Sequence, residues 1–205
     1  MNVSAYIIAG GEGKRLGVPK WGVELAGERM IARVAAALSV VASNGKATVV
    51  ARNRIEVAGL RVITDSPPAG FDEAGGPLVG LYTALRDAQS EWIIAAACDL
   101  PFVSGELFKK LLSECSDDLD AVVPVQPDGT PQPLCAAYRV AACLPAAKQA
   151  IAEGRLSMFA LLDRVRTRFV PFEDLAGLPG SGLFFFNINT PEDLAKASEI
   201  IRTDH

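Results

Sequence analysis

Histidine is almost absent from this sequence, and its cysteines do not form a metal-binding pattern. The one histidine, His205, is the last of 205 residues, and no C-x-x-C pair occurs among Cys98, Cys115, Cys135 and Cys143. Zinc sites and Ser–His or Cys–His catalytic pairs need such residues, so the sequence argues against them. Unpaired thiols are typical of a reducing cytoplasm, where we expect this protein.

Long apolar runs and an excess of positive charge are also missing. Mean hydropathy is +0.24, yet no stretch of eighteen apolar residues is free of charge, so the 50% hydrophobic residues indicate a packed core and no membrane span. Lysine and arginine number 20 against 24 acidic residues, a net charge of −4, which argues against a general nucleic acid-binding face. The N-terminus carries no basic segment typical of a signal peptide.

Strand and helix patterns alternate along the first 125 residues. Short apolar runs predict buried strands, at 4–9, 47–51, 60–64, 92–97 and 121–125. Helical spacing, together with the start signals Pro77 and Ser104, predicts helices, at 30–41, 77–88 and 104–114. Such alternation predicts an α/β fold with a mostly parallel sheet and helices on both faces.

Residues 126–205 carry a different pattern. A proline-rich segment precedes residues 134–139, which we interpret as an antiparallel strand, and the aromatic run from Phe184 predicts one more strand. Further helices are expected, at 140–153, 157–164 and 191–203. No repeat or long linker divides the chain, so we expect a single domain spanning residues 1–205.

The loop after the first strand combines glycine with positive charge. Residues 10–20 read GGEGKRLGVPK. Residues 13–23 include three basic residues, Lys14, Arg15 and Lys20, and no acidic residue. Glycines let successive backbone N–H groups surround an anion, so the loop predicts a phosphate site. An ordinary turn with basic side chains in solvent is the alternative.

Two familiar phosphate-binding motifs do not fit this loop. A Walker A sequence would need glycine where Ile8 stands and a hydroxyl where Arg15 stands. The dinucleotide fingerprint would need a third glycine where Leu16 stands. Arg52, near the end of the second strand, leaves an NADP site as a minor alternative.

Two carboxylates directly follow apolar strands, where ligands of open parallel sheets bind. They are Asp65, after LRVIT, and Asp99, after WIIAAAC. Hard oxygen ligands suit Mg²⁺, and Asp99 is the better candidate, although either residue could instead cap a turn. Asn187 and Asn189 share a face of the expected aromatic strand and could read a heterocycle or a phosphate, or bond the local backbone.

Four blocks together resemble one family. They read IIAGGEGKRLGVPK at 7–20, TDSPP…GGPLVGL at 64–81, WIIAAACDLPFV at 92–103 and FFNINTPEDL at 185–194. In order and spacing they are similar to the nucleotidyltransferases of the molybdenum cofactor guanylyltransferase family. The first block is shared by many nucleotidyltransferases, and the other three narrow the resemblance to this branch and its close relatives.

The resemblance implies a fold and a reaction. The fold would be a three-layer, doubly wound α/β domain of the nucleotide-diphospho-sugar transferase type, with residues 1–125 binding the nucleotide and 126–205 the acceptor. GTP and Mg²⁺ would bind, and GMP would pass to the phosphate of molybdenum-bound molybdopterin as pyrophosphate leaves. A reactive, oxygen-labile acceptor also makes hand-over to other proteins of the cofactor pathway an expectation.

Specific residues take roles by the same resemblance. Lys20 would meet the phosphates, Asp65 the nucleoside and Asp99 the magnesium. The chemistry of the reaction, apart from the resemblance, predicts that Arg15 and Lys20 neutralise charge on the leaving pyrophosphate. The backbone against the nucleotide would be that of Ile8, Ala9, Gly10 and Gly11. The turn at 76–78 would lie near the base, and Asn187 and Asn189 would face the pterin.

Three departures from the family leave the substrates open. Pro19 stands where aspartate is common, Ala51 falls where the family has a nucleotide-binding asparagine, with Asn53 two positions on, and the loop 66–76 is longer. CTP with molybdopterin, or a nucleoside triphosphate with a sugar phosphate or other small phosphorylated acceptor, is therefore an alternative. A non-catalytic nucleotide sensor is another, against which the joint presence of Arg15, Lys20 and Asp99 argues.

Overall fold

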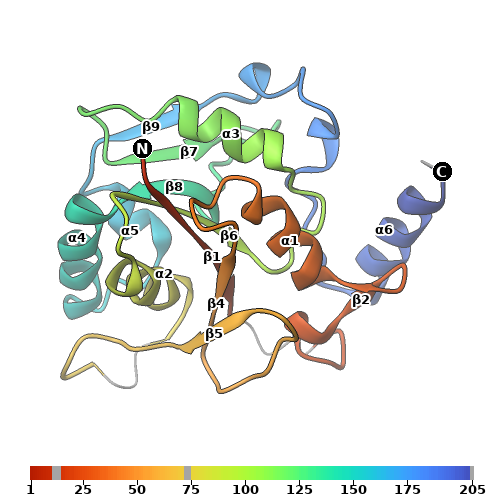
Figure 1. The fold of residues 1–205 in the computed structure, drawn as a ribbon, viewed down its shortest axis with the longest axis horizontal. Coiled ribbons are helices and arrows are strands. Elements are labelled where there is room, and N and C mark those ends of the chain that lie inside the picture. Colours follow the sequence, from red (N-terminus) through yellow and green to blue (C-terminus); the bar gives the residue numbers. More distant parts are fainter. Residues whose placement is uncertain (11–14, 72–74, 204–205) are drawn as a thin grey trace.

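The computed structural model describes residues 1–10, 15–71 and 75–203, and its centre is one seven-stranded sheet (Figure 1). The order across the sheet is β5-β4-β1-β6-β8-β7-β9. The strands are β1 (Val3–Ala9), β4 (Ala47–Ala51), β5 (Arg61–Thr64), β6 (Trp92–Ala97), β7 (Ala121–Pro124), β8 (Cys135–Arg139) and β9 (Thr167–Val170). Only β8 runs against the other described strands of this sheet, so the prediction of a mostly parallel sheet is confirmed.

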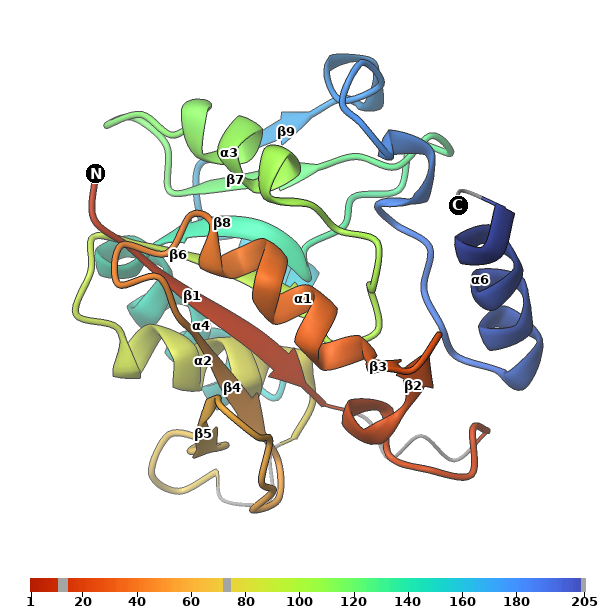
Figure 2. The same cartoon turned by 45° about the vertical axis from the view of Figure 1, so that its right-hand side comes forward.

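Helices cover both faces of the sheet. They are α1 (Met30–Ser39), α2 (Pro77–Asp87), α3 (Gly105–Ser113), α4 (Val140–Ala152), α5 (Met158–Leu162) and α6 (Pro191–Thr203). Helices α1 and α3 pack on one face, and α2, α4 and α5 on the other (Figures 1 and 2). Among the described helices, none is long and apolar enough to cross a membrane.

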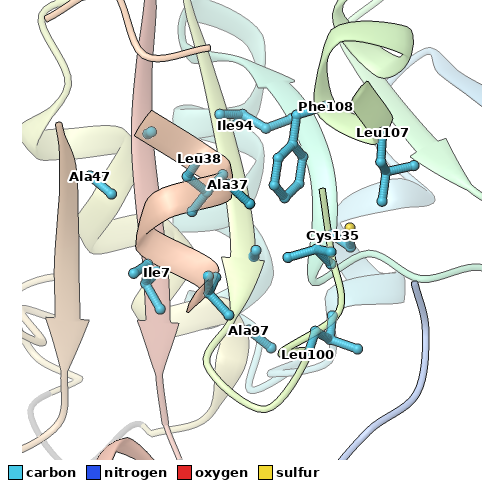
Figure 3. Packing of buried hydrophobic residues seen from close by; sticks show 14 of the residues in the cluster. Ile7, Ala37, Leu38, Ala47, Ile94, Ala97, Leu100, Leu107, Phe108 and Cys135 are labelled. Carbon is cyan, nitrogen blue, oxygen red and sulfur yellow. The ribbon is translucent and has the colours of Figure 1, made fainter. Parts of the chain in front are cut away.

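The central strands are buried on both faces because their side chains alternate between the two helix layers. Ile7 and Ile94 point toward α1 and α3, where Figure 3 shows them beside Leu38 and Phe108. Tyr6, from the same strand as Ile7, packs toward α2. Each fully buried large apolar side chain contributes about 1.5–3 kcal/mol, which holds the carboxyl edge of the sheet in place.

Short elements connect the sheet to the chain ends. A hairpin of β2 (Glu24–Leu25) and β3 (Glu28–Arg29) follows a 3₁₀ turn, η1 (Lys20–Gly22), and packs against α6. Two further 3₁₀ turns, η2 (Phe172–Asp174) and η3 (Ser181–Leu183), lie between β9 and α6. The hairpin and β9 were not expected from the sequence, because these strands are short and mostly exposed.

The strand predicted from Phe184 onward is wrong. The chain turns after η3, where Phe186 N donates to Leu183 O at 2.9 Å, and residues 184–189 join no ladder. Phe184 is fully buried in the core beside α1 and α3, whereas Phe186 packs edge-on against Phe102 with ring centroids 6.0 Å apart. The aromatic run therefore fills two separate apolar clusters and does not follow the alternation of a strand.

Candidate functional site

The carboxyl ends of β5, β4, β1 and β6 meet at one edge of the sheet and line a cavity of about 620 Å³. From β1 the chain continues to β4 on one side and later to β6 on the other, which makes this edge the switch point where open α/β sheets bind ligands. Three strand spacings separate β6 from β5, roughly 14 Å. The cavity is therefore wide enough for an elongated ligand laid across the strands.

Lys20 ties together two parts of the chain at this edge. Its Nζ donates to Asp99 Oδ2 and to Asn189 Oδ1, both at 2.5 Å. The side chains of Lys20 and Asp99 are only 18% and 14% exposed, so the ion pair lies largely out of water. A buried pair of this kind holds its geometry firmly, because losing one partner leaves the other charge uncompensated.

Asp99 keeps one oxygen free for a cation. Its Oδ1 is buried and has no hydrogen-bond partner within the described part of the chain, a costly arrangement unless a ligand completes it. The described residues contain no group of three or more His, Cys, Asp or Glu that could hold a metal alone. One carboxylate oxygen together with phosphate and water oxygens is a common set of ligands for Mg²⁺, so the residues present fit that ion.

The segment before α6 is fixed to the same strand end. Ile188 N donates to Asp99 O at 3.0 Å, which places Asn187 and Asn189 on either side of this contact. Asn187 lines the cavity and its Nδ2 donates to Phe185 O at 3.3 Å. The structure thus brings both asparagines to the site through irregular backbone, without the strand that the sequence indicated.

The far end of the cavity holds a second pair of charges. Asp65, directly after β5, is partly buried, and this burial raises the pKa of its carboxyl, while the positive charge of Arg52 acts in the opposite direction. Arg52 follows β4 and lines the same cavity. Gly76 and Pro77, at the start of α2, form the adjoining wall, and the expected place of this turn near the base stays a prediction.

The predicted glycine-rich wall is partly described. Ile8, Ala9 and Gly10 line the cavity between its two charged ends. Gly11 and Lys14 lie outside the described residues. Arg15 is exposed and is not among the residues lining the cavity, so its predicted place in the site is not supported by the structure.

Comparison with known proteins adds to this geometry. Residues 5–166 match the family model of the MobA-like NTP transferase domain. A probable molybdenum cofactor guanylyltransferase from Pelotomaculum thermopropionicum is 33% identical over 202 residues, which cover 96% of this chain and 92% of the relative. The chain belongs to the MobA-like NTP transferase family. It is accordingly a nucleotidyltransferase, and its relatives are named molybdenum cofactor guanylyltransferases.

Solved structures agree with the family and the fold. Molybdopterin-guanine dinucleotide biosynthesis protein A from Archaeoglobus fulgidus superposes with a TM-score of 0.77 at 28% identity, over 98% of this chain and 99% of that chain. The 2-C-methyl-D-erythritol 4-phosphate cytidylyltransferase of Thermus thermophilus has a TM-score of 0.69 at 20% identity, over 98% and 100%, and shows the fold alone. The expected nucleotide-diphospho-sugar transferase fold is confirmed.

Several cavity residues of this family member were not predicted. Trp21 and Gln132 line the cavity without having been singled out, Asn53 was named only for its closeness to Ala51, and Arg52 was considered only for NADP. Gln132 follows β7 and Asn53 follows β4, so both obey the rule that ligand-binding residues come after parallel strands. Asn53 thus lines the cavity together with Ala51, to which the resemblance assigns the position of the family's asparagine.

The thiol nearest the site has no catalytic chemistry. Cys98, adjacent to Asp99, is fully buried, and desolvation raises the pKa of its thiol to about 12. A thiol with such a pKa is protonated at neutral pH and is a poor nucleophile. Cys98 is therefore not a candidate nucleophile at this edge.

Proposed function

We propose that this protein transfers GMP from GTP to the phosphate of molybdenum-bound molybdopterin and releases pyrophosphate. The observation that carries the proposal is the Lys20 ammonium, held between Asp99 at the sheet edge and Asn189 on the C-terminal segment. A nucleotide on the strand ends and an acceptor beside residues 187–189 would meet at this cation. The names of the relatives support the choice of substrates.

Phosphate chemistry explains why the site needs no catalytic nucleophile. The acceptor phosphate is already anionic at neutral pH, so the protein must hold two anions together in line and stabilise the charge that moves onto pyrophosphate. The backbone of Ile8, Ala9 and Gly10 would lie against the nucleotide across the strand ends. Arg15 lies outside the cavity wall, so any charge that it adds would have to act on the pyrophosphate from the exposed loop.

Lys20 is suited to act on the phosphates. An ammonium has three N–H donors, of which Asp99 and Asn189 take two in the structure. The third can donate to a phosphate oxygen without breaking either contact. Fixed donors of this kind stabilise the transition state more than mobile ones do, because no reorganisation is needed when charge develops.

Asp99 would hold Mg²⁺ through its buried, unpartnered Oδ1. When bound, the ion would screen the phosphate oxygens and stabilise the leaving pyrophosphate. The backbone of Asp99 has its own role, because its carbonyl accepts from Ile188 N and so keeps the acceptor segment beside the metal ligand.

Pyrophosphate release tests this function directly. The protein is incubated with Mg²⁺, molybdenum-bound molybdopterin and either GTP or CTP, and pyrophosphate is measured over time. We expect release that requires the acceptor and is fastest with GTP. Faster release with CTP would assign the sister reaction instead, and nucleotide binding without acceptor-dependent release would indicate a sensor.

The CTP arm is needed because two departures lie in the cavity itself. Ala51 is buried in the wall where the family has asparagine, and Pro19 precedes Lys20 in place of aspartate. Both residues line the space available to a nucleotide. A reaction with a sugar phosphate would show as pyrophosphate release when that acceptor replaces molybdopterin.

A further inference from the structure

Arg52 has no part in phosphate transfer as proposed above, yet it lines the cavity. It follows β4, whereas Lys20 and Asp99 lie by β1 and β6, so Arg52 lies toward the end of the cavity away from the reacting phosphates. A triphosphate centred on Lys20 would direct its base toward Arg52.

The guanidinium of Arg52 lies against the backbone of the loop that leads into α2. A Cβ built on Gly75 would lie 3.3 Å from both Cζ and Nη1 of Arg52. Glycine at this position therefore lets the planar guanidinium rest on the loop. The group is placed beside the wall formed by Gly76 and Pro77.

Asp65 lies at the same end, in space that another glycine provides. A Cβ on Gly80 would come within 3.6 Å of Asp65 Oδ1 and within 2.9 Å of Ile8 Cγ2. Asp65 is partly buried, and its environment combines desolvation with the opposite charge of Arg52. This end of the cavity thus presents the paired N–H donors of the Arg52 guanidinium and the two acceptor oxygens of the Asp65 carboxylate.

Among the nucleobases, guanine matches this pair of groups. Its O6 and N7 are adjacent acceptors, the edge that arginine reads by two parallel hydrogen bonds. Its N1–H and N2 amino group are adjacent donors for one carboxylate. Adenine and cytosine present an exocyclic amino donor where guanine has O6, and arginine has no acceptor to offer it.

We infer that Arg52 selects the base in this protein by donating to O6 and N7 of guanine, with Asp65 accepting from N1–H and the N2 amino group on the adjacent edge. The inference rests on the proposed guanylyl transfer and adds a residue that determines its specificity. A bidentate contact of this kind discriminates between bases by about 5- to 150-fold.

Replacing single atoms of the ligand tests this contact. Binding of GTP and of 7-deaza-GTP, which lacks the N7 acceptor, is measured by calorimetry with Mg²⁺ for the parent protein and for Arg52→Ala. We expect the parent to bind 7-deaza-GTP about 10-fold more weakly than GTP, because a hydrogen bond to a charged group is lost. In Arg52→Ala that difference should disappear, and GTP itself should bind about 5- to 150-fold more weakly.

Arg54→Ala is the matched control, because it removes the same charge two positions along and Arg54 does not line this cavity. It should bind both nucleotides as the parent does. Arg52 is exposed, so its replacement should leave the melting temperature nearly unchanged, and a melting curve checks this.

The possible outcomes distinguish the inferred role of Arg52 from the proposed guanylyl transfer. An equal loss of GTP, CTP and 7-deaza-GTP binding in Arg52→Ala would show that Arg52 holds phosphate, and would overturn the inference alone. A parent protein that prefers CTP would overturn the proposed function as well. An unchanged ratio of GTP to CTP affinity in Arg52→Ala would leave the function intact and refute the role of Arg52.

Discussion

At the scale of single residues, Lys20 is the group on which the proposed site depends most. It joins Asp99 and Asn189, which are 79 and 169 positions away along the chain. Sequence reasoning selected all three residues separately, from a basic loop, a carboxylate after a strand and an amide pair. It could not show that one ammonium contacts both partners, because such contacts depend on the packing of the whole chain.

Removing either charge of this pair should lower the rate of turnover more than it weakens substrate binding. Lys20→Ala and Asp99→Ala should each lower the rate of pyrophosphate release by roughly 10² or more, as expected for loss of one electrostatic stabiliser. Lys46→Ala, an exposed lysine in the loop before β4, is the control and should keep the parent rate. Near-normal release by either site variant would remove that residue from the mechanism.

Asp65 should oppose stability while it serves binding. Burial raises the pKa of its carboxyl above 3.8, so the charged form disfavours the folded state once the pH exceeds the ordinary pKa. Asp65→Asn should therefore raise the melting temperature at pH 7, and the gain should shrink as the pH falls toward 3.8. The same variant should bind GTP more weakly.

Thermal melts from pH 3.5 to 8, with and without GTP, measure both effects of Asp65→Asn. Glu173→Gln, an exposed residue of η2, is the control for the lost charge and should change neither quantity. A lower melting temperature for Asp65→Asn at pH 7 would contradict the expected sign.

At the scale of elements, the start of α6 positions the acceptor side of the site. Asp193 Oδ2 accepts from Asn189 N at 3.0 Å and from Thr190 N at 2.9 Å, and Thr190 Oγ1 accepts from Asp193 N at 3.2 Å. The helix expected at 191–203 thus begins with Thr190 as its cap and a proline at the first helical position. This reciprocal cap fixes the backbone of Asn189, whose side chain contacts Lys20.

Breaking this cap should affect stability and turnover together. Asp193→Ala should cost about 1 kcal/mol of unfolding free energy near neutral pH, within the usual range for a lost helix cap. The hydrogen bond from the Asn189 backbone N–H contributes most to lowering the pKa of Asp193. The stabilisation of the folded state by the Asp193 carboxylate should therefore be present above pH 3.8 and be lost as the pH falls below that value. Turnover should fall because Asn189 no longer holds Lys20 in place.

Urea unfolding at pH 7 and pH 3, together with pyrophosphate release, measures this cap. Glu192→Ala removes the same charge from the exposed first turn and is the control. Equal stability losses in the two variants would mean that helix charge, and not the cap, explains the effect.

Elements with strong periodicity or clear end signals were predictable, and the others were not. Ser104 caps α3 by accepting from Leu107 N at 3.2 Å, and Pro77 opens α2, as the sequence indicated. β9 failed because a four-residue strand with two exposed side chains carries too little alternation. The aromatic run from Phe184 failed because burial against two separate clusters mimics the apolar content of a strand.

At the scale of the whole molecule, the order of strands interleaves the two expected functional halves. β8, from residues after 125, lies between β6 and β7, both from residues before 125. It pairs with β6 from Trp92↔Arg139 to Ala96↔Cys135. Neither half can complete its part of the sheet without the other, although the division into nucleotide and acceptor halves stays a prediction.

This interleaving predicts that the two halves unfold in one transition. Trp92, fully enclosed in β6, reports on residues 1–125 by fluorescence. The thiols of Cys135 and Cys143, both buried, report on residues 126–205 when their labelling is measured peptide by peptide, apart from that of Cys98 and Cys115. In urea the two signals should share one midpoint, because opening either half exposes the same sheet. Phe184→Ala should lower both urea midpoints together and leave the slope of the transition unchanged. The loss of unfolding free energy should be about 3–5 kcal/mol, since the change removes a fully buried aromatic side chain from a core to which both halves contribute. Two midpoints, or a shift of the thiol signal alone, would show that residues 126–205 unfold separately from residues 1–125. The shared sheet would then not make the two halves one cooperative unit.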